Sequence, residues 1–275
     1  MKTLALALGA GGARGLAHIV ALEALDELGV QPVAIAGASV GALIGAAYAA
    51  GLSGRDIRRH ILALAHDRGE VFRRLMAARA ASLSHVLAAP FSNPMLVDGE
   101  KLTAAFLPAA IPDDFAALRI PLTVVATDLY ARREVVFSAG PLRPALAASM
   151  ALPGLVRPVV IHKRVLLDGG AVDPLPFGQL AGRADIIMAV DCSAAQASDG
   201  RVPDPWECVF ATITVMGQTI VAEKLKQGAP DLVVRPNVGR FRLLDFLLAS
   251  AILRAAEPVR AEVRERLGAL LATSR

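Results

Sequence analysis

The most informative segment of the sequence is Val33-Ala34-Ile35-Ala36-Gly37-Ala38-Ser39-Val40-Gly41. Its first residues form a short apolar run of β type, and a helical pattern of small residues follows it at Ala42–Ala50. The small residues of Gly-x-Ser-x-Gly permit the strained strand-to-helix turn that exposes a serine hydroxyl above a sheet. A glycine-rich junction with an incidental serine is the alternative. The strand before Ser39 and the helix after it favour a nucleophile.

Apolar runs of strand type alternate with helical patterns along the whole chain. Most of these runs are continuously apolar, which is typical of a sheet covered on both faces. Alternating strands and helices predict a mainly parallel sheet. We therefore expect an α/β fold, a three-layer α/β/α sandwich with these strands: Thr3–Leu8, Val33–Ala36, Leu122–Thr127, Glu134–Phe137, Arg164–Leu167, Ile186–Val190 and Leu232–Arg235.

The helical segments set the expected domain organisation. The length predicts a single domain over residues 1–275, with a core of residues 1–200 and a mainly helical extension, residues 201–275, packed on it. Pro258 should break or kink the last helix. The expected helices are Leu16–Leu28, Ala42–Ala50, Arg55–Ala65, Val71–Ala81, Lys101–Leu107, Glu207–Lys224 and Phe241–Leu271.

Composition excludes several classes of protein. Of the 275 residues 55% are hydrophobic, so the chain can bury a large core and is not a disordered protein. The net charge of +4 suits an anionic membrane surface or substrate, but no dense Lys/Arg run interleaved with aromatics indicates nucleic-acid binding. Cys192 and Cys208 are too few for a disulfide framework and lack metal-site spacing. We therefore expect reduced thiols, a cytoplasmic location, no metal and no cofactor.

Two segments imitate leader or membrane sequences. The opening apolar run ends at Leu8, which is shorter than the apolar region of a signal peptide. The segment Val33–Gly54 has no charge, but alanine and glycine dominate it. We interpret it as a buried strand followed by a buried helix, and not as a transmembrane helix.

A glycine-rich loop, Gly9-Ala10-Gly11-Gly12-Ala13-Arg14-Gly15, lies between the first strand and the first helix. Such a loop turns several backbone N–H groups toward one point, where they bind a phosphate or a developing oxyanion. A dinucleotide site would need an acidic residue at the end of the second strand, and that strand ends at Gly37 without one. A nucleotide-binding oxidoreductase is therefore the less favoured alternative.

A nucleophilic serine needs a base. The five histidines, at positions 18, 60, 66, 85 and 162, lie in no sequence context typical of a catalytic histidine. Asp168, in Leu166-Leu167-Asp168-Gly169-Gly170, follows an apolar strand at the sheet edge where open α/β folds bind ligands. Asp-Gly also caps ordinary turns, so this fragment alone does not identify the base.

Taken together, these motifs resemble the patatin-like phospholipase family, which uses a Ser–Asp dyad. The resemblance covers roughly residues 3 to 192 and includes further segments: Arg14–Ile19, Ala126–Leu129, Glu134–Phe137, Ala148–Gly154 and Asp168–Pro176. It implies that Ser39 is the nucleophile and Asp168 the base. It also implies an oxyanion hole formed by backbone N–H groups of the glycine loop, supported by an arginine: Gly11, Gly12, Ala13 and Arg14.

Three positions carry weaker expectations. Asp128 resembles a family position near the substrate site, although a turn-capping role fits it equally well. Ser149 is expected on a helix at the wall of the pocket. Ala10 stands where the family has the first glycine of a triplet, and a positive φ there would strain the loop.

The resemblance implies an enzyme that cleaves carboxylic esters of lipids, of phospholipase A or lysophospholipase type. Its partners would be a lipid or other acyl ester and, peripherally, the inner face of a membrane; a homodimer is compatible with the sequence. Burial would have to raise the Asp168 pKa from the ordinary value of about 3.9. A catalytically weak lipid-binding or scaffold protein is the alternative within the family. The Arg-rich segment 55–81 is either a lid over the site or a solvated face.

Overall fold

The computed structural model describes residues 2–78, 97–193, 200, 202 and 204–273. Within these residues eight strands form one sheet. The seven expected strands are confirmed to within two residues at each end. The eighth, β5, was not predicted from the sequence. The strands are β1 Leu4–Leu8, β2 Ala34–Ala38, β3 Leu122–Asp128, β4 Arg133–Phe137, β5 Val159–Ile161, β6 Arg164–Asp168, β7 Ile186–Val190 and β8 Leu232–Val234.

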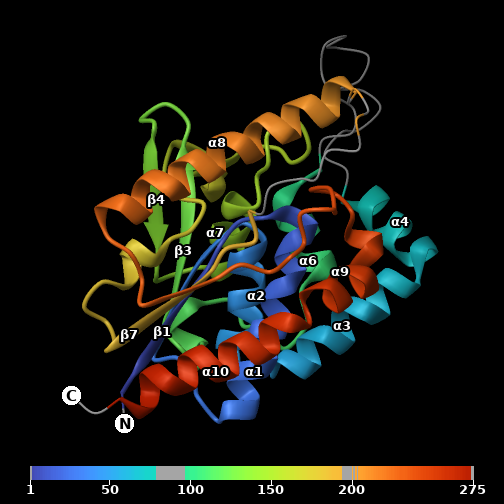
Figure 1. Cartoon of the computed structure of the whole chain (residues 1–275). Coiled ribbons are helices and arrows are strands. Elements are labelled where there is room, and N and C mark those ends of the chain that lie inside the picture. Colours follow the sequence, from blue (N-terminus) through green and yellow to red (C-terminus); the bar gives the residue numbers. More distant parts are fainter. Residues whose placement is uncertain (1, 79–96, 194–199, 201, 203, 274–275) are drawn as a thin grey trace, which may run out of the picture.

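The sheet is mainly parallel, as expected. Strands β3, β2, β1, β7 and β8 lie side by side and run in the same direction. At the β3 end the sheet becomes antiparallel, because β4 and β6 both pair with β3 and β5 pairs with β6. The carboxyl ends of β1 and β3 point toward the top of Figure 1.

The helices follow the expected pattern up to residue 78; residues 79–81 of the expected helix Val71–Ala81 lie outside the described residues. The helix expected from Phe241 begins later, because the carboxylate of Asp245 accepts the N–H of Arg242. Pro258 ends α9 and starts α10, as predicted. The helices are α1 His18–Leu28, α2 Val40–Ala49, α3 Gly54–His66, α4 Arg68–Ala77, α6 Gly99–Phe106, α7 Leu142–Ser149, α8 Pro205–Gln227, α9 Ala249–Ala256 and α10 Pro258–Ala272, with short 3₁₀ turns η1 Gly12–Ala17, η2 Phe115–Ala117, η3 Gly169–Ala171, η4 Phe177–Leu180 and η5 Phe246–Leu248.

The two faces of the sheet are covered by layers of different thickness. In β1 the leucines at positions 4, 6 and 8 join the main core, which includes residues of α1, α2, α9 and α10. The alanines at positions 5 and 7 face the other way and pack with the segment around η4 and with Val221 of α8. Small side chains on that face allow a close covering layer. The α/β fold is confirmed, with its second outer layer reduced to η4 and α8 (Figure 1).

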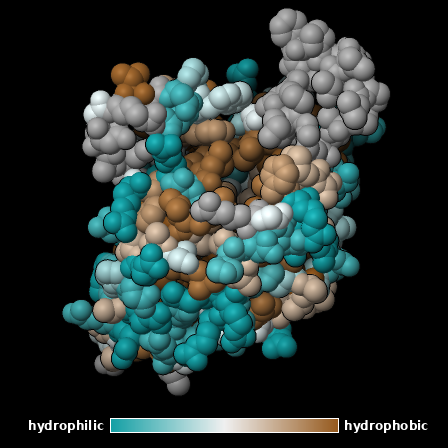
Figure 2. Space-filling model, turned by 90° about the vertical axis from the view of Figure 1, so that its right-hand side faces the viewer, coloured by the Kyte–Doolittle hydropathy of each residue, from teal (hydrophilic) through white to brown (hydrophobic). Residues whose placement is uncertain are grey.

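The surface is also uneven in polarity. Figure 2 shows hydrophilic residues over most of the lower half of one face. In the upper half, apolar residues gather around a hollow. Because the view is turned only about the vertical axis, this apolar area lies at the height at which α8 crosses the molecule in Figure 1.

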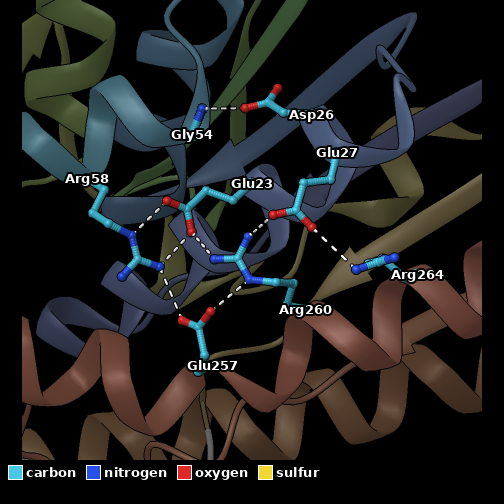
Figure 3. A network of polar contacts seen from close by, with 8 residues as sticks. All are labelled: Glu23, Asp26, Glu27, Gly54, Arg58, Glu257, Arg260 and Arg264. Carbon is cyan, nitrogen blue, oxygen red and sulfur yellow. Dashed lines mark hydrogen bonds and ion pairs between the residues drawn. The ribbon is translucent and has the colours of Figure 1, made fainter.

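A network of ion pairs fixes α3 and α10 on α1 (Figure 3). The Glu23 carboxylate accepts hydrogen bonds of 2.7 and 2.5 Å from Arg58 of α3, and Arg260 of α10 donates to it at 2.6 Å. Glu23 is nearly buried, and its hydrogen bond raises the pKa of Arg58. A carboxylate shared by two guanidinium groups stabilises the docking of both helices. The Arg-rich helix α3 is therefore tied to the core.

Candidate active site

Ser39 lies at a sharp turn between β2 and α2. Its backbone has φ 55° and ψ −130°, a conformation that residues other than glycine rarely adopt. The glycines of Gly-x-Ser-x-Gly make this turn possible: a Cβ on Gly41 would lie 2.2 Å from the carbonyl oxygen of Leu8. A Cβ on Gly37 would lie 2.6 Å from the Cα of Ala42. Close packing at both glycines holds Ser39 in this strained backbone conformation.

The sheet brings Asp168 to this turn. On β3, Ala38 pairs with Val125 and Asp168 pairs with Ala126. Because β4 occupies the opposite edge of β3 along Val124–Asp128, β2 and β6 share the remaining edge. They approach each other from opposite directions, so the end of β2 meets the end of β6.

The two predicted catalytic side chains are in direct contact. Ser39 Oγ donates a hydrogen bond of 2.6 Å to Asp168 Oδ2, and Asp168 Oδ1 accepts the N–H of Gly170 at 2.8 Å. Asp168 is 6% exposed. Burial raises its pKa to about 6, although the hydrogen bonds from Ser39 and Gly170 act in the opposite direction. The carboxylate is therefore ionised at neutral pH and more basic than an ordinary aspartate.

Ser149, at the end of α7, holds the backbone of the turn. Its hydroxyl accepts the N–H of Ser39 at 2.9 Å and donates to the carbonyl oxygen of Val125 at 2.7 Å. This fully buried hydroxyl links the backbone of Ser39 to β3. The sequence predicted Ser149 at the pocket wall but did not indicate this positioning contact.

Two further residues fix the neighbouring strand ends. Thr127 Oγ1 donates to the carbonyl oxygen of Asp168 at 2.8 Å, a contact that the sequence analysis missed. Asp128 Oδ1 accepts the N–H groups of Tyr130 and Ala131 at 3.1 and 2.9 Å, which caps the turn between β3 and β4. The Asp128 carboxylate therefore caps a turn, which is the alternative role expected for it from the sequence.

The glycine loop lies against the C-terminal part of the chain. Gly12 has φ +55°, whereas Ala10 is not among the described residues with positive φ, so alanine at that position causes no strain. The N–H of Ala13 donates to the carbonyl oxygen of Leu243 at 2.7 Å. Gly11 and Gly12 stand at the start of η1, where the first N–H groups have no acceptor within the turn. They are therefore better candidates for oxyanion donors than Ala13.

Arg14 and His18 are both buried beside this loop. Arg14 Nε donates to the carbonyl oxygen of Gly11 at 3.5 Å, and Nη2 donates to Thr214 of α8 at 3.2 Å. Burial lowers the Arg14 pKa. His18 Nε2 lies 2.8 Å from the carbonyl oxygen of Gly9, and burial lowers its pKa to about 4, so the ring is neutral.

Among the described residues, no histidine is a hydrogen-bond partner of Ser39. His18 contacts the loop backbone, and His60 Nε2 lies 2.9 Å from the carbonyl oxygen of Phe106. His85 lies outside the described residues. Within the described part of the chain, no three His, Cys, Asp or Glu residues gather as metal ligands would. The geometry pairs Ser39 with a carboxylate.

Comparisons with known proteins identify the family of this chain. The sequence model of the patatin-like phospholipase family matches residues 6–181. An uncharacterised NTE family protein of Mycobacterium tuberculosis is 38% identical over 203 residues, which are 74% of this chain and 52% of that protein. A protein named lysophospholipase NTE1, from Coccidioides immitis, is 27% identical over 97% of this chain and 18% of its own length.

A solved structure supports the fold. VipD from Legionella pneumophila superposes with a TM-score of 0.55 at 15% identity, covering 96% of this chain and 66% of VipD. The chain spans about half the length of the mycobacterial relative that it matches.

Proposed function

The chain belongs to the patatin-like phospholipase family, and from this premise we propose that it hydrolyses carboxylic esters of phospholipids or lysophospholipids through Ser39 and Asp168. The observation that carries the proposal is the 2.6 Å hydrogen bond from Ser39 Oγ to a buried carboxylate. Relatives named lysophospholipases support the substrate class.

Acylation follows from the positions of these two side chains. As Ser39 Oγ attacks the ester carbonyl carbon, its proton passes to Asp168 Oδ2. The N–H groups of Gly11 and Gly12 stabilise the negative charge that develops on the carbonyl oxygen. When the C–O bond to the alcohol breaks, the alcohol takes the proton from Asp168. The acyl group remains on Ser39 as an ester.

Deacylation repeats the same steps with water. Asp168 accepts a proton from the water that attacks the acyl-enzyme, and the same N–H groups hold the second oxyanion. The proton then returns to Ser39 Oγ as the fatty acid leaves. A base with a pKa of about 6 is suited to both steps, because it is free of its proton at pH 7 and binds one more readily than an ordinary aspartate.

Labelling with a fluorophosphonate probe tests the nucleophile directly. We expect the wild-type protein to be labelled, Ser39→Ala to be unlabelled and Asp168→Asn to be labelled much more slowly. Ser53→Ala is a matched control, because Ser53 caps α3 and takes no part in the site. Hydrolysis of lysophosphatidylcholine by the same four proteins then tests the substrate class. A folded wild-type protein that resists the probe would contradict the proposal and favour a catalytically weak lipid-binding protein.

A further inference from the structure

Helix α8, Pro205–Gln227, is unusual among the helices of this protein. It is long and apolar enough to cross a membrane, yet only 11% of its apolar window is buried. A core helix of this composition would be mostly covered. The sequence predicts a helix here, and by its lack of charge only Val33–Gly54 was a candidate for a membrane span. Within that segment β2 and most of α2 are buried, whereas α8 is exposed.

The exposed side of α8 carries no charge over about three turns. Its residues recur at the spacing of one helix face, and we call them the outer stripe: Cys208, Val209, Thr212, Val215, Met216 and Thr219. Val215 and Met216 are 60% and 58% exposed. Surface helices normally direct charged residues outward. On α8 the next exposed residues with charge are Glu223 and Lys226, at its C-terminal end.

The opposite side of α8 faces the protein and contacts the catalytic elements through several polar residues. Thr214 accepts a hydrogen bond from Arg14 of the glycine loop. Lys224 forms an ion pair of 2.7 Å with the buried Asp173, five residues after Asp168. The helix also packs against η3, which directly follows Asp168. These contacts place α8 beside the catalytic dyad.

Two further contacts fix the rest of the helix. Glu207 pairs with Arg242 at 2.6 Å, and Gln218 donates to the carbonyl oxygen of Ser193. The four polar tethers extend along α8 from residue 207 to residue 224. A helix that crossed a bilayer would have to break all of them and expose these groups to hydrocarbon. The arrangement instead suits a helix that lies parallel to a surface.

The loop that Arg242 belongs to adds more exposed apolar side chains. Leu243 covers Gly12, and Leu244, Phe246, Leu247 and Leu248 are between 39% and 44% exposed. Because Arg242 contacts Glu207, this loop lies next to the start of α8. Both α8 and this loop therefore contact the glycine loop, and both carry exposed apolar side chains. An association of two copies through this surface would cover the approach to the site.

We propose that α8 docks flat on a lipid surface through its outer stripe, so that lipid esters enter the Ser39 site from the membrane. The choice of a lipid surface over a second copy rests on the proposed function, because a lipid hydrolase must keep this approach open to its substrate. Trp206 is 56% exposed at the start of the helix, where an indole ring suits the membrane–water boundary.

Trp206 provides the measurement, since it is the chain's single tryptophan. We expect its emission to shift to shorter wavelength when phosphatidylcholine vesicles are added, and brominated phosphatidylcholine to quench it. Val209→Asp and Val215→Asp should each weaken the vesicle partition about tenfold, because each removes an apolar contact and adds a charge. Val33→Asp is the matched control: Val33 is 42% exposed against 45% for Val209 and precedes β2, at the sheet edge opposite Ser39.

Two activity assays separate this proposal from the proposed function. Val209→Asp and Val215→Asp should hydrolyse a soluble short-chain ester at the wild-type rate and vesicle lipid about tenfold more slowly. A wild-type protein that hydrolyses neither substrate but binds vesicles through α8 would contradict the proposed function and leave the docking intact.

Three outcomes would overturn the docking proposal. The first is vesicle binding that the two stripe variants leave unchanged. The second is a stable dimer in sedimentation velocity that Val215→Asp dissociates, with Trp206 already blue-shifted in the absence of lipid. The third is resistance of the bound protein to extraction at alkaline pH, which would indicate a helix that spans the bilayer.

Discussion

Ala38 and Asp168 occupy neighbouring pairing positions on one edge of β3, Ala38 opposite Val125 and Asp168 opposite Ala126. Ser39, the proposed nucleophile, follows Ala38 directly, so its distance from Asp168 is set by the hydrogen bonds of the sheet. A site built on strand ends is held more rigidly than one built on loops. The proposed base is therefore positioned by its own backbone, since Asp168 is the last residue of β6.

The activity should depend on pH through Asp168. Only the ionised carboxylate can accept the serine proton, and its pKa is raised to about 6. We expect kcat/KM for a soluble ester to fall about tenfold per pH unit below pH 6 and to be constant above about pH 7. The measurement is a rate profile from pH 4.5 to 8.5. If the residual activity of Asp168→Asn kept the same inflection, another group would be the base.

The same shift predicts that Asp168 destabilises the fold at neutral pH. The folded pKa of about 6 lies above the ordinary value of 3.8, so the folded state binds the proton more tightly. This contribution to stability is complete below about pH 4 and is lost as the pH rises through about 6. Asp168→Asn removes the titrating charge. At pH 8 it should raise the free energy of unfolding by about 1–3 kcal/mol relative to wild type, and at pH 4 the gain should vanish.

Urea denaturation of wild type and Asp168→Asn at pH 4 and pH 8 checks this prediction. All other groups titrate alike in the two proteins, so they cancel in the difference between the two free energies of unfolding. A variant that is less stable than wild type at pH 8 would show that the carboxylate's hydrogen bonds outweigh its desolvation.

Ser149 should matter for catalysis although its side chain contacts only backbone atoms near the nucleophile. Ser149→Ala leaves the buried N–H of Ser39 and the carbonyl of Val125 without their shared hydroxyl. We expect a stability loss of about 1–3 kcal/mol and about a tenfold decrease in kcat, because the strained turn loses a support.

The control for this prediction is Ser53→Ala. Ser53 caps α3 and accepts the N–H of Asp56, so its loss costs about 1 kcal/mol of stability and should leave kcat unchanged. Equal kcat values for the two variants would show that Ser149 has only a structural role.

The contrast between Ser39 and Ser149 shows how much of the site the sequence could reveal. Ser39 and Asp168 are each followed by glycine-containing turns next to apolar strands, and such local patterns can be recognised in a sequence. Ser149 is a single serine on a helix, 110 residues from its partner, and no local pattern marks that contact. The positions of the strands and their burial on both faces follow from continuous apolar runs. This explains why the α/β fold was predicted correctly.

One distant contact and one local side-chain contact account for the late start of the last helical segment. Residues 241–245 have helical spacing, but the carbonyl of Leu243 accepts the N–H of Ala13 and the Asp245 carboxylate accepts the N–H of Arg242. The exposed side of α8 could not be predicted either. Apolar residues occur all around that helix, and its side facing the protein is set by contacts with distant residues, among them the ion pairs with Arg242 and Asp173.

Two glycines with left-handed backbones test the oxyanion loop. Gly12 has φ +55°, and a Cβ there would lie 2.3 Å from the carbonyl oxygen of Leu243. Gly29 has φ +65°, and a Cβ there would meet no atom within 4 Å. Alanine at either position has the same backbone penalty of about 1–2 kcal/mol. Only Gly12→Ala also forces Leu243 and the glycine loop apart. This would move the N–H groups that we propose as oxyanion donors.

We therefore expect Gly12→Ala to lower kcat at least tenfold and Gly29→Ala to leave kcat unchanged, with a smaller loss of stability. Thermal unfolding and hydrolysis of a soluble ester, measured on both variants, separate backbone strain from loss of the oxyanion donor. If Gly12→Ala retained the wild-type kcat, the donors would have to lie outside this loop, because the added methyl group cannot be accommodated without moving either Gly12 or Leu243.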